Sequence, residues 1–202
     1  MTTTKFELTG NKISLRDWQL SDLPHYTHWL QPGHKWQFFD GPYYPKPKSE
    51  NIPNIISDLK RSMPHDATVI PRRRLVIANL KNDEFIGLVS WYWQSRETNW
   101  LSVGIAIHDE AQWGQGFGYE ALGLWCSYLF QTMPTIVRLD LRTWSGNNGM
   151  MHLAQKLGFR EEARFRSARI VDGEYFDGLG YGILREEWHN LYPNGFLIPD
   201  SA

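Results

Sequence analysis

The chain has 202 residues, enough for one ordinary domain, and its 42% hydrophobic and 21% charged residues exclude a mainly disordered protein. The net charge of −1 provides no field that would attract nucleic acid, and the longest apolar run, residues 86–93, is too interrupted to span a membrane, so neither is an expected partner. The single cysteine, Cys126, excludes an internal disulfide and a multi-thiolate zinc site, and with no signal-peptide stretch at the N-terminus we expect a cytoplasmic protein without a bound metal.

The predicted elements begin with a short strand at residues 12–16 and a helix that starts at Ser21-Asp22. Residues 31–50 are rich in proline, glycine and aromatic side chains and predict a packed loop on the substrate side. A short amphipathic helix at 52–63 precedes an antiparallel hairpin of residues 75–80 and 85–93. In the next strand, 101–107, large and small side chains alternate, which predicts one bulky and one slim face.

The second half of the chain alternates helices and strands. A helix is predicted at 117–130, a strand at 135–143, a helix at 147–157 that ends at Gly158, and a hairpin of 159–171 and 175–184 around Asp172-Gly173. Strands before, between and after the helices, with no repeat and no linker, predict a single mixed α/β (α+β) domain over residues 1–202, with its core at 12–188.

Residues 112–121, Gln-Trp-Gly-Gln-Gly-Phe-Gly-Tyr-Glu-Ala, join a predicted strand to a predicted helix and contain three alternating glycines. Glycines let successive amides turn toward a ligand, and the start of a helix adds free N–H groups and a positive dipole end. This segment therefore predicts a cradle for a pyrophosphate.

Two other phosphate-binding loops fit the segment less well. A nucleoside-triphosphate loop needs lysine and then serine or threonine after its last glycine, where this chain has Tyr119-Glu120. A dinucleotide-binding loop needs glycine at Tyr119 and belongs to a first βαβ unit, whereas this loop follows several strands. Asp140 does lie at about the distance expected of a ribose-binding acid, so a nicotinamide-dependent oxidoreductase is kept as an alternative.

The string at residues 113–121, following the strand at 102–107, resembles the acetyl-CoA pyrophosphate loop of the GNAT superfamily of N-acetyltransferases. Asn147-Asn148-Gly149 with the later Gly158-Phe159 resembles that family's second signature, and residues 173–177 and 185–188 are similar to its ribosomal-protein N-terminal acetyltransferase branch. The resemblance extends from about residue 13 to residue 188. It implies a GNAT-like fold, with a central, mostly antiparallel twisted sheet of about seven strands, flanking helices and a splayed acetyl-CoA cleft.

The resemblance also implies the reaction, which is transfer of acetyl from the cosubstrate acetyl-CoA to a primary amine by direct attack in a ternary complex. The acceptor would be a peptide N-terminus or a small amine. Apart from the resemblance, we expect some of the aromatic residues in 36–44 to face it, and Asp40 and Glu97 are further candidate bases or amine-attracting acids. The resemblance leaves a homodimer as an open alternative to a monomer. The implied cofactor-binding residues are Val103, Ile105, Ile107, Trp113, Gly114, Gln115, Gly116, Phe117, Gly118, Tyr119, Asn147 and Met150.

The catalytic acid and base do not transfer from the family. Ser102 stands where many members carry a glutamate base, and Met150 and Ala154 stand where a proton-donating side chain is common. We therefore name three candidates: Asn147, which would contact the pantetheine or a catalytic water, Ser102, and His108, whose ordinary pKa lies near neutrality. The departures also leave a second hypothesis, a non-catalytic acyl-CoA-binding sensor or scaffold.

Overall fold

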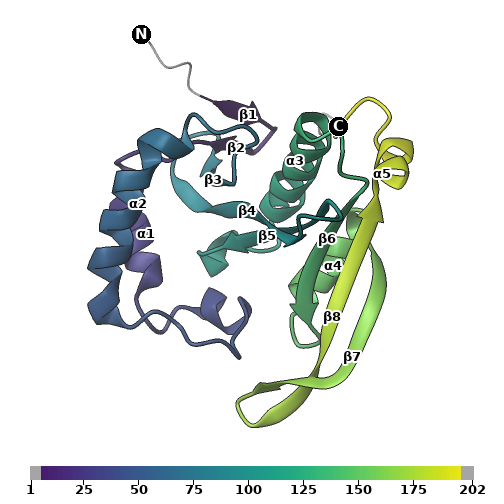
Figure 1. The fold of residues 1–202 in the computed structure, drawn as a ribbon. Helices are drawn as coiled ribbons and strands as arrows, with labels where there is room; N and C mark the ends of the chain where they lie inside the picture. Colours follow the sequence, from purple (N-terminus) through teal and green to yellow (C-terminus); the bar gives the residue numbers. More distant parts are fainter. Residues whose placement is uncertain (1–5, 197–202) are drawn as a thin grey trace.

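The structure is a computed structural model that describes residues 6–196, over which the chain forms an eight-stranded sheet in the order β1-β2-β3-β4-β5-β6-β8-β7 (Figure 1). The strands are β1 (Glu7–Thr9), β2 (Ile13–Arg16), β3 (Arg74–Asn79), β4 (Phe85–Ser95), β5 (Trp100–Ile107), β6 (Arg138–Trp144), β7 (Arg160–Val171) and β8 (Glu174–Leu184). Neighbouring strands pair antiparallel except β5 and β6, which are parallel. The predicted mixed α+β fold is confirmed, and the short β1 is a strand that the sequence did not indicate.

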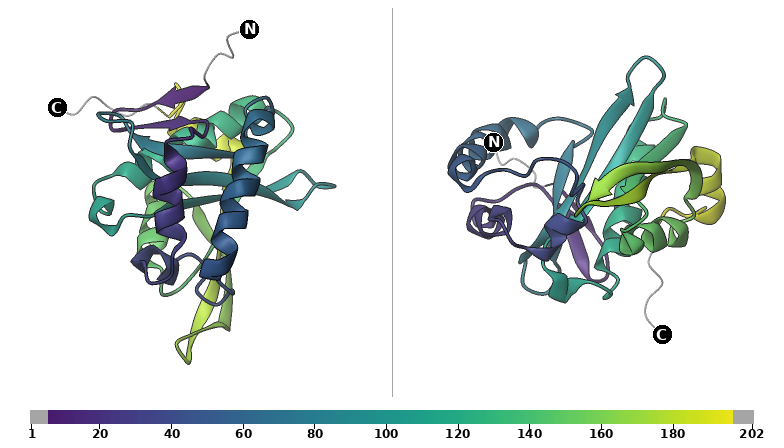
Figure 2. Two further views of the ribbon diagram at one scale, coloured as in Figure 1. Left: turned by 90° about the vertical axis from the view of Figure 1, so that its left-hand side faces the viewer. Right: turned by 90° about the horizontal axis from the view of Figure 1, so that it is seen from below.

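Helices cover both faces of the sheet. On one face α1 (Asp22–Leu30) and α2 (Ile52–Asp66) lie side by side (Figure 2). On the other face are α3 (Phe117–Thr132) and α4 (Asn148–Lys156), and α5 (Arg185–Leu191), which was not predicted, follows β8. The connection between α1 and α2 contains only short 3-10 turns, Lys35–Phe38 and Ser49–Asn51, and lies at the same end of the molecule as the protruding β7–β8 hairpin (Figures 1 and 2).

Side chains alternate between the two faces of the sheet along each strand, so the core consists of two clusters, one on each face. The larger cluster lies between the sheet and α3, where Leu75, Ile77 and the helix residue Trp125 are fully buried. A smaller cluster on the opposite face packs Val76 and its neighbours against the aromatic side chains of α1 and the segment before it. Cys126 is fully buried in the larger cluster, and burial raises the pKa of its thiol, so its role is packing.

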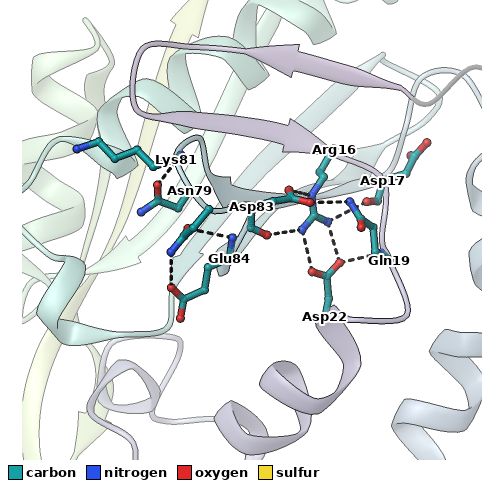
Figure 3. A network of polar contacts seen from close by, with 9 residues as sticks. Arg16, Asp17, Gln19, Asp22, Asn79, Lys81, Asp83 and Glu84 are labelled. Carbon is teal, nitrogen blue, oxygen red and sulfur yellow. Dashed lines mark hydrogen bonds and ion pairs between the residues drawn. The ribbon is translucent and has the colours of Figure 1, made fainter.

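A buried arginine fastens α1 to the sheet (Figure 3). Arg16 of β2 is fully buried, and its two terminal nitrogens donate to the Asp22 carboxylate at 2.8 and 2.9 Å. Its Nε donates to Asp83 in the β3–β4 turn at 2.6 Å. This network fixes the start of α1 relative to β2 and to the β3–β4 turn.

The sheet divides between β5 and β6. These strands pair only at Leu101–Leu139 and Ser102–Asp140 and then separate, whereas the other edge of β5 stays paired with β4 as far as Ile107. The backbone of residues 103–107 therefore has a strand partner on one side only. This is the splayed cleft that the resemblance implies.

Candidate active site

A cavity of about 650 Å³ opens where β5 and β6 separate. Its walls are residues 103–107 of β5, residues of the glycine loop, residues 141–144 of β6, and the start of α4. The wall includes Leu153 of α4 on one face of the sheet and Trp36 of the α1–α2 connection on the other. The cavity is therefore lined by residues from both faces of the sheet.

The glycine loop forms an anion cradle at the start of α3. Gly116 is the N-cap of this helix with φ of +89°, and Gly114 has φ of +73°, both in the left-handed region that favours glycine. Among residues 6–196, no group accepts a hydrogen bond from the amides of residues 114–119. Consecutive free amides at a positive dipole end match the chemistry of a pyrophosphate, so these residues fit coenzyme A.

Two contacts from the start of β2 hold this loop. Lys12 Nζ donates to the carbonyl of Gln115 at 2.9 Å, which adds a positive charge beside the cradle. The Glu120 carboxylate, 2% exposed, accepts from the amides of Lys12 and Ile13 at 2.9 and 3.1 Å. Sequence reasoning missed both residues because their partners lie more than 100 positions away; the acidic residue in the first turn of a helix was the only signal.

We call residues 34–44 the strap because they join the two sides of the cleft. Asn147 caps α4 by accepting from the Met150 amide at 3.0 Å, and its Nδ2 donates to the Phe39 carbonyl at 3.2 Å. Trp144 Nε1 donates to the same carbonyl at 3.4 Å. On the other side, the Phe39 ring contacts Trp113 edge-on, with centroids 5.5 Å apart, and Trp113 Nε1 donates to the carbonyl at the end of β5 at 3.0 Å.

The structure brings most of the predicted site residues together. All the predicted cofactor residues except Gln115 line the cavity, as does Asp40, whereas Glu97 does not. Sequence reasoning missed other cavity residues, namely Leu141, Arg142, Thr143, Trp144, Gly146, Leu153 and Lys156. They belong to β6, the turn after it and α4, where strand or helix pattern alone does not indicate which side faces a cleft.

Two of the three candidate catalytic residues do not line the cavity. Ser102 belongs to the last β5–β6 pair, is fully buried, and its Oγ lies 3.0 Å from the donor Gln94 Nε2. His108 is 2% exposed, and its ring lies 4.5 Å from that of Trp36. Burial lowers the pKa of His108 to about 4, so the imidazole is neutral at neutral pH. Asn147 is the candidate that faces the cavity.

This fold, with a helix N-terminus facing the gap between two separated strands, defines the class of GNAT-type acetyltransferases. A family model described as an acetyltransferase (GNAT) domain matches residues 12–160, and the chain belongs to this family. Family members use acetyl-CoA as the acetyl donor.

One curated relative is the SPbeta prophage-derived uncharacterized N-acetyltransferase YokL of Bacillus subtilis, 25% identical over 112 residues. The match covers 55% of this chain and 62% of that protein, less than two thirds of its length.

Solved structures share the fold. A GNAT-family acetyltransferase from Bacillus anthracis has a TM-score of 0.70 at 15% identity, covering 90% of this chain and 100% of that one. RimL, a ribosomal L7/L12 alpha-N-protein acetyltransferase in complex with coenzyme A, has a TM-score of 0.68 at 16% identity, covering 89% and 98%. A chimera of the Vibrio cholerae spermidine N-acetyltransferase SpeG with hSSAT has a TM-score of 0.65 at 17% identity, covering 89% and 99%.

Two further findings concern partners. No helix within residues 6–196 has the length and apolar character needed to cross a membrane. Over the same residues, no group of three or more His, Cys, Asp or Glu side chains is arranged to hold a metal ion.

Proposed function

We propose that the protein transfers acetyl from acetyl-CoA to a primary amine by direct attack of the amine in a ternary complex. The observation that carries the proposal is a cavity lined from both faces of the sheet, with the amide cradle in one part of its wall and the strap in another. We infer a separate entrance for each substrate, one at the cradle and one at the strap. No cysteine or serine is among the described residues that line the cavity, so the wall offers neither of these common nucleophiles to carry the acetyl group. Direct transfer between two bound substrates is the reaction this arrangement supports.

Different groups of the chain would bind the pyrophosphate, the pantetheine arm and the thioester carbonyl. The amides of residues 114–119 and the charge of Lys12 would hold the pyrophosphate, and the free edge of β5 at residues 103–107 would pair with the pantetheine arm. Bound acetyl-CoA supplies an activated acetyl group. A backbone N–H on the same edge would donate to its carbonyl, and one such donor typically stabilises the transition state by about 3 to 4 kcal/mol.

Asn147 is the predicted catalytic residue that we retain in this proposal. It lines the cavity, and its amide holds the strap at Phe39. Its role is to position the acceptor side of the cavity while capping α4. Neither Ser102 nor His108 enters the proposed reaction, because neither is among the residues that line the cavity.

The proposal is tested by calorimetric titration with coenzyme A and by thiol release from acetyl-CoA with a panel of amines. Binding in the micromolar range or tighter is expected, equivalent to about 8 kcal/mol or more. No binding at millimolar coenzyme A would refute the proposal. Binding without amine-dependent thiol release would support the sensor hypothesis, and binding of NAD in place of coenzyme A would support the oxidoreductase.

A further inference from the structure

The acceptor entrance is on the face of the sheet that carries α1, α2 and the strap. Alternation along β6 directs Leu139 and Leu141 into the core beneath α3, so Asp140, Arg142 and Trp144 project from the opposite face. Trp144 confirms this direction by donating to the strap carbonyl of Phe39. Arg142 lies two positions beyond the last β5–β6 pair and lines the cavity, and its guanidinium lies over the ring of Trp100 at the start of β5.

The neighbouring strand leaves room for arginine side chains on this face. Gly178 and Gly180 of β8 pair with Trp144 and Arg142, so any side chain at these glycines would share the acceptor face. A Cβ at Gly180 would lie 3.5 Å from Arg142 Nη1, and one at Gly178 would lie 3.5 Å from Arg169 Cζ. Arg142 and Arg169 therefore lie along a strand surface with no side chains of its own.

The guanidinium of Arg142 is not neutralised by a close partner. The carboxylate of Asp140 is engaged by Arg138 Nη2 at 2.6 Å and reaches Arg142 only at 4.0 Å. Within residues 6–196, Arg142 donates no hydrogen bond, and its guanidinium lies 5.6 Å over the ring of Trp100. Arg142 is thus a cavity-lining residue whose exposed guanidinium has five N–H donors and, among the described residues, only a long ion pair with Asp140.

Two side-chain donors on this face lack acceptors. The buried side-chain atoms without a hydrogen-bond partner in the described chain are Trp100 Nε1 and Arg169 Nε, together with His108 Nδ1 outside the cavity. Arg169 lies 4.6 Å over the ring of Tyr43, a strap residue that lines the cavity, while its Nη1 donates to its neighbour's carbonyl. Buried donors without partners are rare in folded proteins, so a ligand that supplies acceptors would satisfy Trp100 Nε1 beside Arg142 and Arg169 Nε beside Tyr43.

The charges of the cavity wall favour an anion over a polycation. The charged side chains among the described lining residues are Asp40, Arg142 and Lys156. Lys156 lies 4.5 Å over the ring of Tyr119 in the glycine loop, which leaves Asp40 and Arg142 at the acceptor end. A polyamine would meet one carboxylate and a guanidinium whose ion pair with Asp140 is 4.0 Å long, whereas an amine bearing a carboxylate would give this guanidinium a close acceptor.

We infer that the acceptor amine carries a carboxylate, that it is an amino acid, and that Arg142 binds this carboxylate with Arg169 as a secondary contact. The inference rests on the proposed function. The aromatic strap residues Trp36, Phe39 and Tyr43 line the same entrance, so an amino acid with an apolar side chain is favoured.

The experiment compares two amino acids with their amides, which lack the carboxylate, and with spermidine. Phenylalanine, phenylalaninamide, leucine, leucinamide and spermidine are each assayed by thiol release from acetyl-CoA. We expect kcat/KM at least tenfold higher for each amino acid than for its amide. In Arg142→Gln this preference is lost through a tenfold or greater rise in KM for the amino acids, a much larger change than any in kcat/KM for the amides or in the Kd for coenzyme A. Arg142→Lys restores part of the preference.

The control removes an equivalent charge outside the cavity. Arg166→Gln changes an exposed arginine of β7, and the preference should persist in this variant. Equal use of acids and amides by the wild-type protein, better use of spermidine, or an unchanged preference in Arg142→Gln would each overturn the inference.

A binding measurement separates this inference from the proposed function. With coenzyme A present, phenylalanine should raise the thermal midpoint of the wild-type protein more than phenylalaninamide does, and Arg142→Gln should abolish the difference. If no amine releases thiol but this difference is found, the proposed function fails and the carboxylate site stands. If amines are acetylated but the difference is absent, only the inference about Arg142 fails.

Discussion

Replacing Gly116 with valine should abolish tight binding of coenzyme A without unfolding the protein. Gly116 adopts φ of +89° at the N-cap of α3, and its bare Cα forms part of the cavity wall. A Cβ at this position would lie 3.6 Å from Lys12 Nζ, and apart from the adjoining residues nothing else in the described chain lies within 4 Å of it. The substitution therefore introduces backbone strain and a branched side chain between the amides and their ligand.

The two effects have different magnitudes and can be separated. A side chain held at positive φ costs about 1 to 3 kcal/mol of stability, which a folded domain generally tolerates. Each hydrogen bond to a charged phosphate is worth about 1.5 to 3 kcal/mol, so loss of even one raises Kd by about 10- to 150-fold. Binding should therefore weaken by far more than a modest loss of stability explains.

Gly173→Val is the matched control. Gly173 has φ of +84° in the β7–β8 turn, nothing lies within 4 Å of its Cβ position, and it is not part of the cavity wall. Urea denaturation should show similar losses of stability in the two variants, and calorimetric titration should show weakened coenzyme A binding only in Gly116→Val. Equal affinity in both variants would show that the pyrophosphate does not lie on this loop.

Three further outcomes follow from contacts around the site and the core. Lys12→Met removes the hydrogen bond to the Gln115 carbonyl and a charge beside the cradle, so KM for acetyl-CoA should rise about fivefold with kcat unchanged. His108 has a folded-state pKa of about 4, below its ordinary 6.5, so the unfolded chain takes up this proton first as pH falls. The free energy of unfolding should therefore fall between pH 6.5 and pH 4, by up to about 3 kcal/mol. In denaturation measured at pH 7 and 4.5, His108→Phe should remove this part of the loss. Asp22→Asn removes a carboxylate that pairs with the buried Arg16, so the free energy of unfolding should fall by about 3 to 5 kcal/mol in urea denaturation. Asp58→Asn, in an exposed ion pair, should lower it by less than about 1 kcal/mol.

The glycine loop could be predicted because its signal is local. Three alternating glycines between a strand and a helix already specify which backbone can turn and where free amides gather, and the structure places two of them at positive φ. The hairpin turn at Asp172-Gly173 is local in the same sense, and both residues have positive φ there. In such segments the residues that determine the conformation are the residues that adopt it.

The strap and the surroundings of His108 depend on distant partners. Asn147 could be recognised as a helix cap from its neighbours, but its second contact, with Phe39, joins residues 108 positions apart. His108 is followed by the charged Asp109 and Glu110, yet its ring turns away from solvent and packs against Trp36. Sequence neighbours do not report burial when the covering group comes from another element.

The position of the cleft follows from the one parallel pair in the described sheet. Antiparallel neighbours can be joined by tight turns, but β5 and β6 run in the same direction and need a crossover, which α3 supplies. The crossover brings a helix N-terminus to the carboxyl end of β5, and the early separation of the strands leaves that end paired with β4 only. The cradle, the free edge and the cavity between the strands therefore share one cause, the early separation of β5 from β6. The pairing ends at Ser102–Asp140, and neither strand's own sequence indicates that it ends there.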